Sequence, residues 1–507
     1  MNVALAAYPE LLSLAARVAR LHGYHTVITL GLAPWAGTFA GAPDLDLVEI
    51  STGSDRPKAG RISGFHRQLT WNPARGRFPP LDRRVLARSV VCLRLGCLPG
   101  ERTTSIDAVR ALLELAPVSI VASPRPRSRD PDALGHVLAA VGLPPTFEGR
   151  LSASGTPDAD VAIVDRVVGE AKDAAPSGFR VVAVMTAYNE EDIIGPSIEA
   201  LVADGIGVYL IDNWSSDRTH DIAQAHLGRG LVGLERFPAA PTPTFDLTRL
   251  LHRVEDVTAG LQCDWCIHHD ADERKVGPWP GRSLRDALWV AQRSGFNAID
   301  QTVLDFRPVD NGFVPGTDHE AYFRHFEFGA ELGDQLKIQA WRNTGQRVVL
   351  AESGGHEAVF AGRRVFPYKF LLKHYPIRSQ AHGERKILVE RRARWNLAER
   401  AKGWHVHYDD VATGHVFLRD PAELVEFVDG QTERDYLVPL ISGAGLVSTT
   451  VPGWVVRSRA GRLAYRAVRR AANGPVGDSL RSSRLLRLPV LRRSVRWLRR
   501  SLLGGGP

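Results

Sequence analysis

The feature that most constrains the fold is a pair of short apolar runs, each followed by polar residues and then by a helical pattern. Residues 181–185 (Val-Val-Ala-Val-Met) are rich in β-branched side chains and carry no charge, as expected of a strand buried on both faces of a parallel sheet. The run 208–211 (Val-Tyr-Leu-Ile) repeats the pattern. Two successive strand-loop-helix units place both loops at the carboxyl edge of one sheet, where open α/β sheets bind ligands. We therefore expect an α/β domain with a ligand site at that edge.

The loops after the two strands carry the polar groups that such a site needs. The first reads Thr-Ala-Tyr-Asn-Glu over residues 186–190, and we expect the acids 190–192 in the first turn of a helix, where they suit the helix dipole. In the second loop Asp212 follows the strand directly. One alternative is that residues 215–217 merely cap the next helix. That alternative does not account for Asp212, which precedes the cap.

A third apolar run, residues 265–267, leads to two carboxylates separated by one residue, Asp270 and Asp272. Mg²⁺ and Mn²⁺ prefer hard oxygen ligands, and Mg²⁺ is typically bound through one or two carboxylates together with substrate phosphates. The pair therefore predicts a divalent-cation site at the end of a third strand. A pair of this kind is a weak signal alone, and it gains weight from the two loops that precede it.

Together the three segments resemble the motifs of family 2 glycosyltransferases, which have the GT-A fold, over roughly residues 180–408. The resemblance implies an inverting transfer of a sugar from a nucleoside diphosphate donor to an acceptor hydroxyl, with Mn²⁺ or Mg²⁺ bridging the diphosphate. It implies that the nucleotide-sugar is bound by Thr186, Tyr188, Asn189, Glu190, Asp212, Asp217 and Asp270. The implied metal ligands are Asp270, Asp272 and His374, because a late histidine completes the metal shell in many such enzymes.

The general base is where the chain departs from the family, which usually has an acid in a Glu-Asp pair before a helix. Glu255 and Asp256 form such a pair but precede the metal motif. Residues 351–357 (Ala-Glu-Ser-Gly-Gly-His-Glu) are more suitable, because their glycines would let the backbone approach a substrate. His356 and Glu357 are therefore the candidate bases.

His374 stands at the end of an expected strand, and the alternative to a metal ligand is a partly buried histidine. Three basic residues follow it closely: Arg378, Arg385 and Lys386. They are candidates to contact the diphosphate, and solvated surface charge is the alternative.

The first 170 residues predict a second α/β domain, which we expect to be Rossmann-like. The expected strands are 25–30, 45–50, 89–95, 118–122 and 159–164, and the expected helices are 9–21, 105–115 and 132–141. Residues 90–93 and 112–124 resemble the later strands of class I S-adenosylmethionine-dependent methyltransferases. The glycine-rich turn of that family is reduced to Gly31, and Glu49 stands where an acid would hold a ribose. We expect a degenerate methyltransferase-like domain, structural or acceptor-recruiting, and an active methyltransferase is the alternative.

Charge is concentrated at the carboxyl end of the 507 residues. Residues 455–507 contain fourteen arginines and one acid, Asp478, so the first 454 residues carry −5 of the net +8. Nucleic acid is therefore not an expected partner of the whole chain. In residues 490–503 the apolar residues follow a 4-3-4 spacing with arginines on other faces, which predicts a basic amphipathic helix on an anionic membrane surface. A tail docked on the acidic body and a disordered segment are the alternatives.

These patterns divide the chain into domains at 1–170, 179–430 and 431–507, with a linker at 171–178. Four cysteines are too few for a disulfide framework, and Cys263 and Cys266 are expected in a core. No signal peptide and no run of eighteen apolar residues is seen. We expect a cytoplasmic enzyme, peripheral at the inner face of the membrane, whose acceptor is a glycan or a lipid-linked molecule. A non-catalytic nucleotide-sugar-binding scaffold is the remaining alternative.

Overall fold

The computed structural model divides into two compact units, whose main continuous parts are Met1–Asp173 and Ala174–Asp429. The division falls within the expected linker. The residues described below are 15–16, 18–30, 46–51, 66–70, 85, 88–94, 116–124, 138, 145–153, 156–170, 173–328, 336–394, 396–400, 411–430 and 432. The expected amphipathic helix at 490–503 and the glycine turn at Gly31 lie outside this set.

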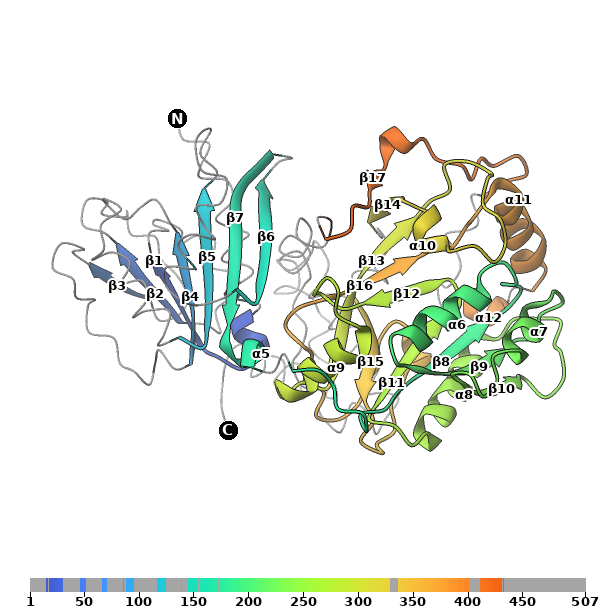
Figure 1. The fold of residues 1–507 in the computed structure, drawn as a ribbon, viewed down its shortest axis with the longest axis horizontal. Coiled ribbons are helices and arrows are strands. Elements are labelled where there is room, and N and C mark those ends of the chain that lie inside the picture. The colour runs from blue at the N-terminus through green and yellow to red at the C-terminus, as the bar shows by residue number, and fades with distance from the viewer. Residues whose placement is uncertain are drawn as a thin grey trace, which may run out of the picture. The chain divides into compact units, whose positions relative to one another are not determined.

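The first unit contains a seven-stranded sheet in the order β3-β2-β1-β4-β5-β7-β6 (Figure 1). Its elements are β1 (Thr26–Leu30), β2 (Asp46–Ser51), β3 (His66–Thr70), β4 (Ser89–Arg94), β5 (Val118–Pro124), β6 (Phe147–Ala153), β7 (Thr156–Asp165) and the helix α5 (Arg166–Glu170). Neighbours among β1 to β5 are parallel, whereas β7 is antiparallel to both β5 and β6. The strand order reverses between β1 and β4, as in doubly wound α/β sheets.

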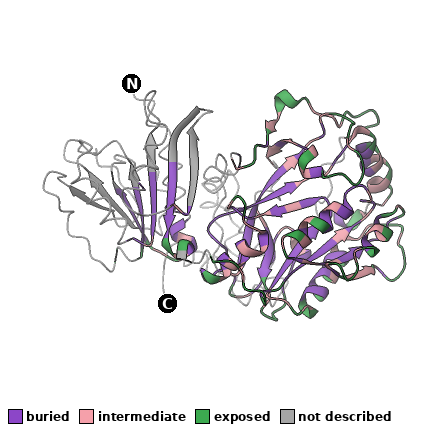
Figure 2. Cartoon of the chain, in the orientation of Figure 1, coloured by how far each residue is buried: buried purple, intermediate pink, exposed green. Residues whose placement is uncertain are grey.

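The second unit is built on a larger mixed sheet in the order β10-β9-β8-β11-β15-β13-β14-β17, with β12 and β16 paired beside it. Its strands are β8 (Val181–Ala187), β9 (Gly207–Asp212), β10 (Leu231–Arg236), β11 (Trp265–Asp270), β12 (Glu273–Val276), β13 (Ala298–Phe306), β14 (His325–Phe328), β15 (Lys337–Arg342), β16 (Phe370–His374) and β17 (Val425–Glu426). Neighbours among β10, β9, β8 and β11 are parallel, and β15 is antiparallel to β11. The three expected strands are thus central, and Figure 2 shows them buried along most of their length.

Helices follow β8 and β9, as expected, and further helices lie later in the unit. They are α6 (Ile194–Ala203), α7 (Thr219–Gln224), α8 (Leu247–Gly260), α9 (Leu284–Arg293), α10 (His319–Tyr322), α11 (Gln380–Gly383), the π-helix η5 (Glu384–Arg391), α12 (Leu397–Arg400), and the 3₁₀ turns η4 (Ala351–Ser353) and η7 (Pro421–Glu423). Within the described ranges, no helix is long and apolar enough to cross a membrane.

One local expectation is wrong. The acids 190–192 precede α6, which begins at Ile194, because a turn closed by the bonds from the Ile193 and Ile194 N–H groups to the Glu190 carbonyl comes first. Asp420 caps only the single turn η7, and the edge strand β17 follows at once.

Glu255, on α8, anchors the segment that contains η4. Its carboxylate is buried, and Oε1 accepts hydrogen bonds from the backbone N–H groups of Leu350 and Ala351, at 2.7 and 2.9 Å. Glu255 is therefore a structural hydrogen-bond acceptor for a loop that lies far from it in the sequence.

We predict that Glu255→Ala lowers the free energy of unfolding by about 2–4 kcal/mol, because each buried donor left without a partner costs about 1–3 kcal/mol. Urea denaturation followed by tryptophan fluorescence measures the change. The matched control is Asp256→Ala at the next, exposed position of the same helix, which should change stability by less than about 0.5 kcal/mol. Equal effects of the two substitutions would contradict the assignment.

Candidate active site

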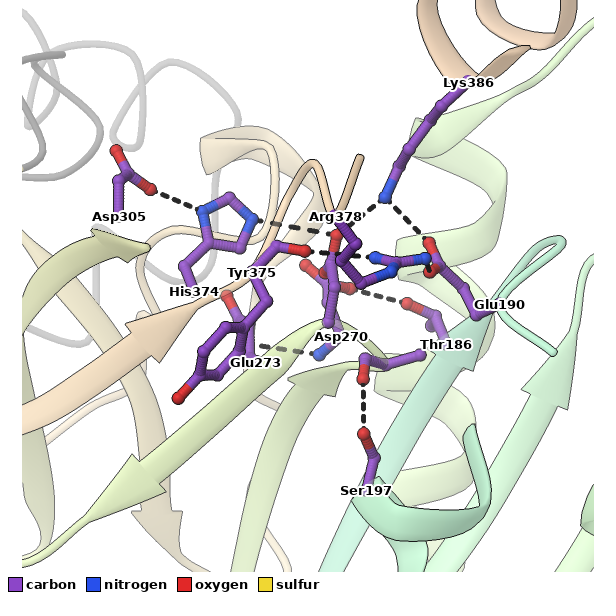
Figure 3. Close-up of polar contacts among 12 residues, drawn as sticks. Thr186, Glu190, Ser197, Asp270, Glu273, Asp305, His374, Tyr375, Arg378 and Lys386 are labelled. Carbon is purple, nitrogen blue, oxygen red and sulfur yellow. Dashed lines mark hydrogen bonds and ion pairs between the residues drawn. The ribbon is translucent and has the colours of Figure 1, made fainter. Parts of the chain in front are cut away.

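The register of the central strands brings the three polar loops together. β8 and β11 align Thr186 with Asp270, and β8 and β9 align Ala187 with Asp212. The Thr186 hydroxyl donates a hydrogen bond of 2.7 Å to Oδ1 of Asp270 (Figure 3). Burial would raise the pKa of Asp270, but the neighbouring His268, the Thr186 hydrogen bond and Lys337 outweigh it, so this pKa is lowered.

The chain turns after Asp270 and places Asp272 opposite a strand from much later in the sequence. Ala271 donates its N–H to the Thr186 carbonyl, and the turn leads into β12. β12 pairs with β16 so that Glu273 stands opposite His374. The Tyr375 N–H then donates to the Asp272 carbonyl at 2.8 Å. The expected cation ligands Asp272 and His374 are therefore neighbours in space.

His374 is oriented by a second carboxylate. Its Nδ1 lies 2.7 Å from Oδ1 of Asp305, on β13, and its Nε2 lies 3.8 Å from Oδ2 of Asp272. Burial would lower the pKa of His374, but Asp305 and Asp272 outweigh it and raise the pKa. A histidine whose Nδ1 is held by a carboxylate and whose Nε2 faces another oxygen has the orientation that metal-binding histidines take.

A buried group of charges lies on the other side of Asp272. The Lys386 ammonium is 2.8 Å from Oδ2 of Asp272 and 2.8 Å from Oε1 of Glu190. Arg378 pairs with Glu190 and makes two bonds to Asp192, at 2.6 and 2.8 Å. Burial would raise the pKa of Asp272, but Lys386, His374 and Arg378 lower it well below its ordinary value.

Lys386 and Arg378 belong to a series of side chains spaced four residues apart, which we call the stripe. Each member contacts another member or one of the motif loops, which are the loops after β8, β9 and β11. The members are Arg378, His382, Lys386, Glu390 and Arg394. The segment that carries them includes the π-helix η5, a rare geometry that is frequent at functional sites. Arg378 and Lys386 are candidates for diphosphate contact, with solvated surface charge as the alternative. Both side chains are buried, so neither is a solvated surface charge. The spacing of the stripe was readable in the sequence, and its partners were not.

The far end of the stripe reaches the loops after β8 and β9. Glu390 accepts a 2.9 Å hydrogen bond from Nδ2 of Asn189, and Arg394 donates one of 2.8 Å to Oδ1 of Asn213. The Arg394 guanidinium also lies 4.0 Å from the centre of the Tyr188 ring. One segment thus crosses the carboxyl ends of β8, β9 and β11.

Asp212 is fully buried at the end of β9. Its Oδ1 accepts the Ser215 N–H at 3.1 Å. Its Oδ2 lies 3.2 Å from Nε of Arg236 but makes no hydrogen bond, which leaves one buried oxygen with unused acceptor capacity. The side chain of Arg236 is 38% exposed and covers this oxygen.

The side chains of Asp217 and Asn189 make hydrogen bonds within the loops after β8 and β9. Asp217 accepts hydrogen bonds from the backbone and hydroxyl of Thr219 and from the Glu191 N–H, so both of its oxygens hold the start of α7 and the preceding loop in place. The N-cap residue of α7 is Arg218, so Asp217 acts one position before the cap that stood as the alternative. Asn189 has a positive φ of 55° and accepts the Ser216 N–H through Oδ1. A role for either residue in nucleotide binding stays a prediction.

The candidate bases lie on a different segment. Glu357 forms an isolated bridge with Ile338 of β15, and its carboxylate pairs with the buried guanidinium of Arg363 at 2.7 Å. The backbone carbonyl of His356 accepts the Ile338 N–H. A carboxylate held by a buried guanidinium is a poor proton acceptor, so the geometry weakens the case for Glu357. The role of His356 as the base stays a prediction.

The donor set of Asp272 and His374, with Asp270 beside it, fits a divalent cation that takes its other ligands from a substrate. Within the part of the chain that the structure describes, no group of three or more His, Cys, Asp or Glu side chains is placed to hold a metal ion, so Asp270, Asp272 and His374 do not form a three-ligand site by themselves. Mg²⁺ sites of nucleotide enzymes commonly have only one or two protein carboxylates plus phosphates, so an incomplete cage suits them.

Comparison with known proteins finds no family model that matches the chain and no curated protein that is significantly similar. Among solved structures, S. aureus TarS aligns over 27% of this chain and 23% of its own, at 14% identity and a TM-score of 0.20. A shorter form of TarS in complex with UDP aligns over 26% of this chain and 37% of its own, at 14% identity and a TM-score of 0.19.

Glucosyl-3-phosphoglycerate synthase from Mycobacterium tuberculosis, in complex with Mn²⁺ and UDP-glucose, aligns over 27% of this chain and 47% of its own, at 20% identity and a TM-score of 0.20. The chain therefore spans less than half the length of each of these structures. TM-scores this low do not establish a shared fold.

The raised pKa of His374 predicts a pH dependence in the metal-free protein. A folded-state pKa above the ordinary value of 6.5 means that the protonated ring stabilises the fold. This contribution is fully present below about pH 6.5 and is lost as the pH rises through the folded-state pKa. We expect Asp305→Asn to lower the pKa of His374, measured by NMR titration of the imidazole signals.

The control for this titration is Asp310→Asn, which removes an exposed aspartate from the loop after β13. It should leave the pKa of His374 unchanged. A His374 pKa at or below 6.5 in the unsubstituted protein, or an equal response to both substitutions, would contradict the proposed orientation of the ring.

Proposed function

We propose that the chain is a glycosyltransferase that moves a sugar from a nucleoside diphosphate-sugar to an acceptor hydroxyl. The observation that carries the proposal is the convergence of the loops after β8 and β11 on one buried group of charges, with Thr186 bonded to Asp270 and with Asp272 between His374 and Lys386. Carboxylates, an oriented imidazole and an ammonium at the carboxyl edge of a parallel sheet suit a diphosphate with its cation.

Recognition of the nucleotide is assigned to the ends of β8 and β9. The Oδ2 of Asp212, which is ion-paired with the partly exposed Arg236 but accepts no hydrogen bond, is a suitable acceptor for an N–H group of the base once Arg236 moves aside. The Tyr188 ring, with Arg394 above it, offers a face on which a planar base can stack. Asn189, Glu190 and Asp217 shape these loops through their internal bonds.

The cation, Mn²⁺ or Mg²⁺, would be held by Asp272 and His374 with Asp270 nearby. When bound, it would neutralise charge that develops on the leaving diphosphate. The chain's own part is to hold His374 through Asp305 and to keep Asp270 and Asp272 ionised. His356 is the remaining candidate to accept the proton of the acceptor hydroxyl, and an inverting outcome is proposed from the resemblance to family 2.

The first unit is proposed to be a degenerate methyltransferase-like domain that is structural or recruits the acceptor. Its strand order, with parallel strands β3-β2-β1-β4-β5 and a reversal between β1 and β4, supports a Rossmann-like core. The arginine-rich residues 455–507 are proposed to contact an anionic membrane surface, which suits a glycan or lipid-linked acceptor at the inner face of the membrane.

We predict that Asp272→Asn lowers the release of nucleoside diphosphate from the preferred donor by about 100-fold or more, because a cation ligand is lost from the leaving-group side. Turnover is measured with UDP-, GDP- and dTDP-sugars in Mn²⁺, with membrane glycolipids and glycans as acceptors and with water as the background acceptor.

Glu199→Gln, an exposed change on α6, is the control and should retain full turnover. Circular dichroism checks that each variant is folded. If turnover persists in EDTA and in the Asp272→Asn variant, the proposed dependence on a divalent cation is wrong. No release from any donor by the unsubstituted protein would reject the glycosyltransferase.

A further inference from the structure

Lys386 has an unusual position for a residue next to a cation site. Its ammonium is shared between Oδ2 of Asp272 and Oε1 of Glu190, each at 2.8 Å, and its side chain is only 8% exposed. The carboxylate that would bind a divalent cation is therefore already neutralised by a cation from the protein itself.

Two other charged groups of the candidate site, Arg378 and Asp270, do not have the same freedom. Arg378 is 1% exposed and is fixed by two bonds to Asp192 as well as by Glu190, so its guanidinium is a structural member of the group. The Asp270 carboxylate is 44% exposed and is bonded to Thr186. Among these groups, the Lys386 ammonium is the cation that can exchange one carboxylate for another anion while it keeps a partner in Glu190.

We infer that Lys386 is a diphosphate-binding residue that pairs with Asp272 only while the donor is absent. When a nucleoside diphosphate binds, the ammonium passes from Asp272 to a phosphate oxygen, and Asp272 is released to the divalent cation. This inference rests on the proposed function and adds to it a named residue and a coupling between two ligands.

The exchange has a thermodynamic consequence. Lys386 competes with the cation for Asp272, so the cation alone binds weakly, and the nucleotide strengthens its binding by removing the competitor. Because such coupling is reciprocal, the cation strengthens nucleotide binding by the same factor. Couplings of this kind are commonly worth about 5- to 150-fold in affinity.

The experiment measures two affinities separately on the full chain. Mn²⁺ alone is titrated by the electron paramagnetic resonance signal of the free ion, and UDP, GDP and dTDP are titrated in EDTA by calorimetry. For Lys386→Met we expect Mn²⁺ alone to bind about tenfold tighter, because Asp272 has lost its competitor, and the nucleotide alone to bind about tenfold weaker.

Arg419→Met is the matched control, because it removes the same charge from a residue outside the site, which pairs with Glu327 and Glu423 rather than with Asp272. It should change neither affinity by more than about twofold. Lys386→Gln is the second variant, because its amide can still donate to both carboxylates if the methionine variant does not fold. Like Lys386→Met, it should strengthen the binding of Mn²⁺ alone and weaken the binding of the nucleotide alone.

The outcomes distinguish a failure of the role of Lys386 from a failure of the proposed glycosyltransferase function. If the unsubstituted protein binds a nucleoside diphosphate and neither Lys386 variant changes the two affinities in opposite directions, the role of Lys386 is wrong and the proposed function stands. If the unsubstituted protein binds no nucleoside diphosphate with or without Mn²⁺, both are wrong.

Discussion

The second unit depends on the ion pairs that a late segment makes with the carboxyl ends of its central strands. Three buried carboxylates, Glu190, Asp192 and Asp272, are balanced by Lys386 and Arg378. Buried charges are costly unless they are paired, and loss of one partner leaves the other without compensation. The same contacts that hold the segment on the sheet therefore also set the charge of the candidate site.

Sheet topology decides which side chains can take part in that site. The parallel register of β8, β9 and β11 fixes the position of Asp212 and Asp270 at one edge. The antiparallel pair β12 and β16 then brings His374 to the same place and aims it between Asp272 and Asp305. Hydrogen bonds between strands thus give the polar groups their geometry before any ligand is present.

Local patterns in the sequence were sufficient for the three strands that precede the motif loops. The β-branched runs at 181–185 and 208–211 and the apolar run before Asp270 predict β8, β9 and β11, since a fully buried strand needs a continuous apolar run. β3 (His66–Thr70) was not predicted, because four of its five residues are polar or charged and show no alternation.

Local sequence patterns could not predict side-chain contacts between residues that are far apart in the sequence. Lys386 lies 114 residues after Asp272, and His374 lies 69 residues after Asp305, so neither contact has a local signal. Arg378 and Lys386 were named as possible diphosphate contacts, but a lone basic residue is most often solvated. Only the fold distinguishes the buried pair from surface charge. The contact between Asp217 and Thr219 is local, because the two residues are two positions apart.

The central claim is that this edge of the sheet binds a nucleoside diphosphate together with a divalent cation. The most direct measurement is a thermal-shift panel on the purified chain with UDP, GDP, dTDP and S-adenosylhomocysteine, each with and without Mn²⁺. A ligand at about 100 times its Kd stabilises the native state by about 2.7 kcal/mol. We expect a Mn²⁺-dependent shift with one of the three nucleotides. A shift with S-adenosylhomocysteine alone would contradict the claim and move the working site to the first unit.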